Sequence, residues 1–228
     1  MSIYADEGAD KASEATSQAA RLEPLTPERR RALTRRHLLE AAAVVFARDG
    51  FHRATLDAVA AAAGFTKGAV YSNWRSKDDL FVALLDDRIE RQHAVIREVL
   101  GDDPVHDDDN LARVAQVLRS GVMSWDDTWS ALYLEFVVYA RRNAEARAKL
   151  AAALHRSHAL SADLISRARS RLAGDPKYTS DELAFISMAL FEGLGMARFV
   201  DPDAPHERML ATALAILGDA HDARIVTD

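Results

Sequence analysis

Residues 64–74, GFTKGAVYSNW, hold the side chains that are best suited to binding an anion. Thr66 can cap a helix and Lys67 follows it, so free backbone N–H groups and an ammonium meet where a phosphate is favoured. Gly68 comes next, although glycine costs roughly 1 kcal/mol relative to alanine inside a helix. On an outward face, its missing side chain lets a phosphate or a base edge approach the backbone. A tolerated surface glycine is the alternative, but the cap, Lys67 and an outward Tyr71 favour the first interpretation.

No constellation of residues predicts catalysis, a cofactor or a metal. The chain has no cysteine, which excludes disulfides, thiol nucleophiles and zinc-finger spacings. His155 and His158 are three apart on one predicted helix, but no carboxylate completes a metal site, so surface histidines are favoured. The GLGMAR stretch at 193–198 lacks a preceding strand and a third glycine, so it is no nucleotide loop. We therefore expect a protein that is not an enzyme.

The charge of the chain is unevenly distributed. The formal net charge is −6, yet residues 29–77 hold ten Lys/Arg against three acids, which gives +7 and leaves −13 elsewhere. A basic segment on an acidic protein suggests an end that binds a polyanion. A chance cluster on a solvated face is the alternative, and charge alone does not separate the two.

The elements that would position the basic residues are helices. A first apolar face ends at Gly50, a residue that tolerates the left-handed conformation. A second, short helix runs between a Thr55 cap and Gly64, and a third begins at Thr66. The first face consists of Leu38, Leu39, Ala42, Val45 and Phe46.

The third helix has Val70 and Trp74, four apart, as its inward positions. Ser76 to Asp79 resembles a capping box, which would start a fourth helix that runs to about Leu100. Two short helices joined by a three- or four-residue turn with a glycine form the helix-turn-helix pattern. Residues 1–28, polar and poor in large apolar side chains, are predicted to be a disordered tail.

At this point the chain resembles the TetR family of bacterial transcriptional regulators. The matching stretch is RRHLLEAAAVVFARDGFHRATLDAVAAAAGFTKGAVYSNWRSKDDLFVALL, residues 35–85. The resemblance implies an all-α homodimer with a three-helix helix-turn-helix DNA-binding domain, here 29–82. A larger helical regulatory and dimerisation domain, here 83–228, would follow. A twofold protein of this kind pairs with a roughly palindromic double-stranded DNA operator.

The resemblance also implies which residues meet DNA. Thr55, Tyr71 and Lys77 are expected at phosphates, which position the protein. Arg35 and Arg36 belong to an arginine group that could lie beside the duplex, although a solvated helix flank explains any single arginine slightly better. The residues expected to face DNA from the third helix are Thr66, Lys67, Gly68, Ala69, Tyr71 and Ser72, of which Lys67, Ala69 and Ser72 are expected near base edges.

The second half of the chain predicts further helices, at about 111–124, 128–143, 144–173, 181–200 and 205–220. The 128–143 helix is apolar nearly all round, which is typical of a buried helix. Its polar stripe, Glu135, Tyr139 and Arg142, would anchor a ligand if it faces a cavity. Otherwise Glu135 would pair with an arginine of a neighbouring helix, and this alternative is at least as well supported.

The 181–200 helix has two apolar faces. Leu183, Ile186, Leu190, Gly193 and Ala197 line one, and the other holds Phe185, Met188, Gly195, Met196 and Phe199, with Glu192 among them. One face could serve a dimer interface and the other a core or a pocket. The residues expected to bind a ligand are Trp129, Tyr133, Glu135, Phe136, Tyr139, Met188, Glu192 and Met196.

The resulting hypothesis is a cytoplasmic repressor released by a small, apolar or aromatic effector. A regulator without a small ligand, controlled by a protein partner, is the alternative. No apolar run approaches the ~18 residues of a membrane span, so no membrane association is expected.

Overall fold

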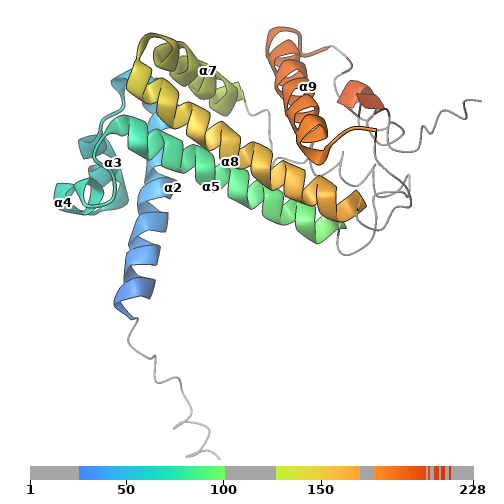
Figure 1. Ribbon diagram of the computed structural model, residues 1–228. Helices are drawn as coiled ribbons and strands as arrows, with labels where there is room; N and C mark the ends of the chain where they lie inside the picture. The colour runs from blue at the N-terminus through green and yellow to red at the C-terminus, as the bar shows by residue number, and fades with distance from the viewer. Residues whose placement is uncertain are drawn as a thin grey trace, which may run out of the picture. The chain divides into compact units, whose positions relative to one another are not determined.

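The computed structural model describes residues 26–100, 127–169, 177–203, 205, 208–210, 212–213 and 216. These residues form helices and no strand, which confirms the all-α prediction (Figure 1). The chain separates into two compact units, Met1–His37 and Leu38–Asp228, each of which is described by itself. Residues 1–25 of the predicted tail and the predicted helix at 111–124 lie outside the described residues.

Helix α2 (Pro27–Arg53) is longer than the sequence predicted at both ends. It begins at Pro27, a position that needs no N–H donor, and Thr26 Oγ1 accepts from Arg29 N at 3.2 Å. The predicted tail therefore ends before residue 28. At Gly50 the helix has φ 71° and ψ 168°, so it kinks where the sequence predicted a stop, and it resumes to Arg53. The rings of Phe46 and Phe51 stack across this kink, with their centres 6.1 Å apart.

Short helices α3 (Leu56–Ala63) and α4 (Lys67–Tyr71) follow, and the long α5 (Lys77–Leu100) begins at the predicted capping box. Ser76 N donates to Asp79 Oδ2, and Asp79 N donates to Ser76 Oγ, both at 3.1 Å. The predicted apolar face of α2 and the predicted inward positions of α4 are buried in the core beneath these helices: Leu38, Leu39, Ala42, Val45, Phe46, Val70 and Trp74. Val59 of α3 and Leu80 and Phe81 of α5 complete this core.

Helices α7 (Asp127–Arg142), α8 (Ala144–Arg169) and α9 (Ser180–Val200) lie close to their predicted bounds. Helices α5 and α8 run side by side in the same direction (Figure 1). Three polar contacts join them at intervals of two helical turns on α5. They are Asp79–Lys149 at 2.7 Å, Asp86–Arg156 at 2.6 Å and His93–Ser161 at 3.0 Å. These contacts fix the register of α5 against α8.

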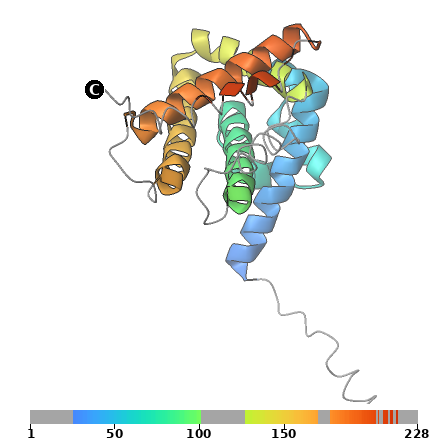
Figure 2. The ribbon, with the colours of Figure 1, turned by 90° about the vertical axis from the view of Figure 1, so that its right-hand side faces the viewer.

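Helix α9 packs across α8 and α7 (Figure 2). Neither predicted face matches its burial. The buried stripe is Leu183, Ala184, Phe191 and Gly195, whereas Phe185, Ile186, Leu190, Met196, Phe199 and Val200 are exposed. Because α9 is apolar nearly all round, periodicity could not select the buried side.

By length and mean hydropathy, 1.6 in its most apolar window, α9 could also cross a membrane, although only 22% of that window is buried. This property differs from the prediction that no stretch of the chain is apolar enough to span a membrane. One such helix is weak evidence of a membrane span, because a core helix of a soluble protein passes the same test. Asp181, Glu182 and Glu192 lie within this helix, and a charge inside a bilayer is costly.

Candidate nucleic-acid interface

The ends of α3 and α4 are set by two threonine caps and one glycine. Thr55 Oγ1 accepts from Ala58 N at 3.1 Å, and Thr66 Oγ1 accepts from Ala69 N at 3.3 Å. Gly64 ends α3 with φ 70°, a conformation that side chains with a Cβ rarely adopt. The predicted helix-turn-helix is therefore present, and its geometry is set by local residues.

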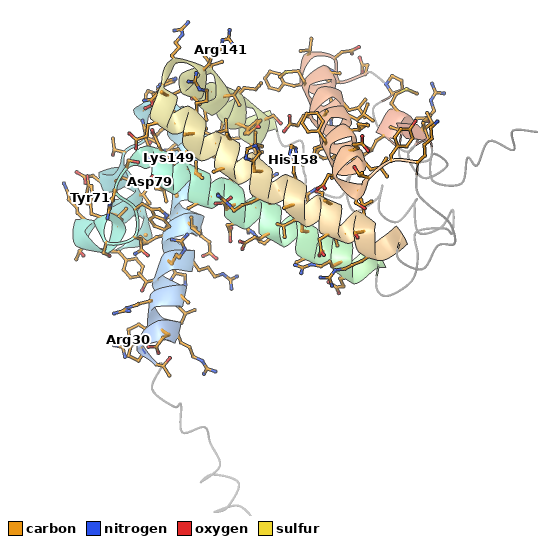
Figure 3. All side chains as sticks on the ribbon, viewed as in Figure 1. Arg30, Tyr71, Asp79, Arg141, Lys149 and His158 are labelled. Atoms are coloured by element: carbon orange, nitrogen blue, oxygen red, sulfur yellow. The ribbon has the colours of Figure 1, made fainter. Side chains whose placement is uncertain are left out.

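Helix α4 has one buried side and one open side. Val70 is fully buried and Trp74 is 4% exposed, as predicted for the inward positions. Lys67, Gly68 and Tyr71 are exposed, and Tyr71 stands on the outer side of α4 (Figure 3). A large aromatic ring that is 52% exposed beside a helix is available to a partner.

Gly68 has no packing reason to be glycine. A Cβ built at this position would meet only Thr66 Oγ1, at an ordinary 3.8 Å. The protein itself leaves room for a side chain there, so the fold does not explain the helix-weakening glycine. A partner that approaches the backbone from outside would explain it.

Two of the residues expected at base edges are less open than the sequence suggested. Ala69 is half-buried, and its carbonyl accepts from Ser72 Oγ at 2.9 Å and from Asn73 Nδ2 at 2.8 Å. The Ser72 side chain is exposed, but its hydroxyl proton is used in the hydrogen bond to the Ala69 carbonyl. Ser72 can still accept a hydrogen bond from a base amino group.

Lys67 and Lys77, the first residues of α4 and α5, both have partners within the protein. The Lys67 ammonium forms an ion pair with Asp57 of α3. The Lys77 ammonium donates to the His52 carbonyl at 2.9 Å and lies 4.6 Å from the centre of the Phe51 ring. Desolvation lowers the pKa of Lys77, against the opposing charge of Asp78. Lys77 thus joins the start of α5 to the end of α2, a link that the sequence did not reveal.

Arg35 and Arg36 belong to the Met1–His37 unit and are exposed on α2. Their exposure fits both alternatives for these arginines, an arm that meets DNA and a solvated helix flank.

The residues predicted to bind a ligand fall into two groups. The first lies in an aromatic seam, which we define as Phe46, Phe51, Phe81, Trp129, Phe136 and Tyr139, where α7 packs on α2 and α5. Phe136 is fully buried, with its ring 4.2 Å from Phe81 and 4.9 Å from Phe51. Trp129 stacks on Phe81 at 5.9 Å. These rings contact one another, so the seam connects α7 to the helix-turn-helix.

Glu135 and Tyr139 also serve this connection. Phe51 N donates to Glu135 Oε2 at 2.8 Å, so the carboxylate satisfies the backbone at the Gly50 kink. From the sequence, Glu135 is expected either to anchor a ligand in a cavity or to pair with an arginine. Neither alternative includes a backbone N–H as its partner. Tyr139 donates to Asp78 Oδ2 at 3.3 Å, a contact between α7 and α5. An open hollow of about 610 Å³ lies beside Glu135, between the end of α2 and the start of α7.

The second group lies where α7, α8 and α9 meet. Tyr133 of α7 hydrogen-bonds Glu192 of α9, and His158 of α8, on the side toward α9, contacts the Phe185 ring at 5.2 Å (Figure 3). Burial raises the pKa of Tyr133, and the Glu192 charge adds to this. Met188 accepts from Ser157 of α8 at 3.7 Å, whereas Met196 is 44% exposed.

This second group brings an acid, a phenol and an imidazole together, with Tyr133 and His158 half-buried and Glu192 exposed. Within the part of the chain that the structure describes, no group of three His, Cys, Asp or Glu side chains could hold a metal.

Comparison with known proteins places the helix-turn-helix in a family. Residues 38–84 match the model of bacterial regulatory proteins, tetR family. The HTH-type transcriptional repressor Rv1474c of Mycobacterium tuberculosis is 38% identical over 72 residues. That match covers 32% of this chain, and the chain spans 38% of that relative's length.

Solved structures resemble the fold over most of the chain. A Rhodococcus structure ascribed to a TetR-family transcriptional regulator is 22% identical, with a TM-score of 0.65, and the match covers 81% of this chain and 97% of that one. The transcriptional regulator FadR from Bacillus subtilis, solved in complex with stearoyl-CoA, is 14% identical, with a TM-score of 0.60. That match covers 82% of this chain and 97% of FadR. At these identities the likeness concerns the fold.

Proposed function

Because the chain belongs to the TetR family of bacterial transcriptional regulators, we propose that it is a homodimeric repressor that binds a palindromic operator and is released by a small molecule. Members of this family are DNA-binding regulators rather than enzymes. The observation that carries the proposal is the open side of α4, where Lys67, Gly68 and Tyr71 are exposed around a glycine that the fold does not require.

In this proposal α4 enters the major groove, and its caps and exposed side chains meet the duplex. Thr55 Oγ1 accepts a bond from its own helix, so its hydroxyl proton is available for a phosphate oxygen. Tyr71 offers a second hydroxyl for phosphate. Lys67 and Ser72 present a donor and an acceptor toward base edges. Arg35 and Arg36 contribute long-range attraction to the duplex.

Pairing of two chains would cover the exposed apolar side of α9. Phe185, Leu190 and Phe199 are each at least 40% exposed on a helix whose other side is packed. Exposed apolar surface of this kind marks an interaction site, and twofold dimers are the commonest assembly. Burial in a dimer also accounts for the high mean hydropathy of α9 without a membrane, which fits a cytoplasmic protein.

An effector would bind next to the group of Tyr133, Met188 and Glu192, where few polar groups stand among apolar side chains. The complex of the similarly folded FadR with stearoyl-CoA supports a ligand in a domain of this shape. The apolar surroundings favour an apolar or aromatic effector.

The signal would pass along α5 and through the aromatic seam. Both routes end at the last turn of α2, which leads directly into α3, because Lys77 of α5 and Glu135 of α7 each bond to the backbone there. A tenfold loss of operator affinity requires that the effector prefer the non-binding state by about 1.4 kcal/mol.

Selection of duplexes from a random-sequence pool tests the proposal directly. We expect the purified protein to enrich an inverted repeat and to bind it, by fluorescence anisotropy, far more tightly than scrambled DNA. Gly68→Glu should abolish this affinity without unfolding the protein, since the position has room for a side chain. A pool that stays unenriched, or full affinity in Gly68→Glu, would refute the assignment.

A further inference from the structure

An acidic residue, Asp57, lies next to Lys67, the basic residue at the start of the exposed side of α4. Asp57, in the first turn of α3, pairs through Oδ2 with the ammonium of Lys67, the first residue of α4. The Lys67 side chain is 69% exposed and that of Asp57 is 45% exposed. The hydrogen bond to Asp57 raises the pKa of Lys67, so the lysine keeps its charge.

The Asp57 carboxylate is held from one side only. Its Oδ1 is buried without a hydrogen-bond partner, whereas its Oδ2 contacts Lys67. Lys67 is thus the contact that compensates this carboxylate. The N-terminal end of α3 favours an acid in its first turn, where Asp57 lies. The Asp57–Lys67 pair therefore carries no net charge on the side of the helix-turn-helix that we assign to DNA.

We propose that Asp57 is a specificity determinant, which withholds Lys67 from phosphates of arbitrary DNA while leaving it free to donate to bases. This inference rests on the proposed DNA-binding function. A phosphate carries a full negative charge, so the nearby Asp57 carboxylate repels it and cancels most of the attraction of Lys67. A base acceptor such as guanine O6 is neutral and is repelled far less.

The ammonium has three N–H donors, so it can keep its bond to Asp57 and still donate to a base edge. Non-specific binding depends on charge, whereas sequence recognition depends on directed hydrogen bonds. The Asp57–Lys67 pair consequently weakens the first kind of binding more than the second.

Asp57→Asn tests this idea, because it removes the charge and keeps the shape. We expect affinity for scrambled duplex at low salt to rise about three- to tenfold, from the loss of one repulsion near a phosphate. The plot of log affinity against log salt should steepen by about 0.9 for each α4 engaged, as one more phosphate is neutralised. Affinity for the selected operator should change less, so the ratio of specific to non-specific affinity falls.

Two controls separate this effect from a general change of charge. Asp87→Asn also removes an acid from an ion pair, with Arg91 on α5 outside the helix-turn-helix, and should leave the specificity ratio unchanged. In a Lys67→Met background, Asp57→Asn should no longer change the salt slope. Asp57→Ser provides a second uncharged variant, and circular dichroism checks that each variant is folded.

An unchanged salt slope and specificity ratio in folded Asp57→Asn and Asp57→Ser would overturn the inference, as would an equal effect of Asp87→Asn. These outcomes differ from failure of the proposed function. In that case the wild-type protein itself would enrich no sequence from the random pool.

Discussion

Replacement of Gly50 by alanine perturbs the contact between α7 and the helix-turn-helix at one point. At φ 71° and ψ 168°, Gly50 occupies a region that is essentially restricted to glycine, and alanine there costs about 1–3 kcal/mol. The new Cβ would also stand 3.0 Å from Oε2 and 3.1 Å from Oε1 of Glu135. The carboxylate must therefore withdraw.

Withdrawal of the carboxylate breaks its 2.8 Å bond with Phe51 N. An unpaired N–H at a residue that is 1% exposed costs about 1–3 kcal/mol. Gly50→Ala should thus lower the free energy of unfolding by about 2–6 kcal/mol, from strain and bond loss together. Glu135→Ala alone should lower it by about 1–3 kcal/mol, because it removes the bond without the strain.

The double variant separates the two contributions. Without the Glu135 carboxylate there is no bond left to break, so Gly50→Ala should then cost only the strain. The two single effects should exceed the double effect by about 1–3 kcal/mol, the bond energy being counted twice. Urea unfolding of all four proteins, followed by circular dichroism at one fixed protein concentration, measures these quantities.

Gly68→Ala is the matched control, since at this exposed glycine of α4 a built Cβ would meet only Thr66 Oγ1, at an ordinary 3.8 Å. We expect it to be neutral or to stabilise by up to about 1 kcal/mol. Additivity of Gly50→Ala and Glu135→Ala within about 0.5 kcal/mol would refute the contact described between Glu135 and the kink.

Three titrating groups give further predictions. Burial lowers the pKa of His93 below its ordinary 6.5, against a hydrogen bond to Ile89 O that raises it. The folded protein therefore binds this proton less well than the unfolded chain, and its stability should fall as the pH drops below about 6.5. His93→Gln should make Tm depend less on pH between pH 7 and 5, and a pH profile of Tm equal to that of wild type would contradict this. Desolvation would raise the pKa of Asp79, but its hydrogen bonds, above all to Lys149, lower this pKa below 3.8. Asp79→Asn should therefore lower the free energy of unfolding, measured in urea at neutral pH, by about 1–2 kcal/mol. The difference from wild type should disappear as the pH falls through the lowered pKa. Desolvation raises the pKa of Glu192, so the contribution of this group to stability is present below its ordinary pKa of 4.5 and is lost as the pH rises through the raised pKa. Between pH 4.5 and 7, Tm of Glu192→Gln should fall less than Tm of wild type. Parallel plots of Tm against pH would contradict this.

The parts of the fold that could be predicted depend on residues close together in the chain. Thr55 and Thr66 each accept from a backbone N–H three residues further on, and the Ser76–Asp79 box spans one turn. Such contacts follow from residue type and spacing alone. The family resemblance then supplied the direction in which α4 faces, which periodicity supports through the buried Val70.

The contacts that the sequence did not reveal are distant in the chain. Glu135 lies 84 residues from Phe51, and Lys77 lies 25 residues from His52. At the end of α2, the donor is Phe51 N and the acceptor is the His52 carbonyl. Both are backbone groups, which nearly every residue carries, so no residue type marks them as partners. The buried side of α9 escaped prediction for a different reason, because apolar residues surround that helix and several sides compete equally.

The position of Trp129 in the aromatic seam makes α7 optically visible. Its indole ring lies nearly parallel to Phe81, with 4° between the planes, and the Arg88 guanidinium lies 4.8 Å from its centre. Emission from this tryptophan should therefore respond when α7 shifts on α5. The chain has two other tryptophans, Trp74 and Trp125, and phenylalanine at both would leave Trp129 as the sole emitter. The protein thus carries its own fluorescent reporter of movement between α7 and α5, which can be read without an attached dye.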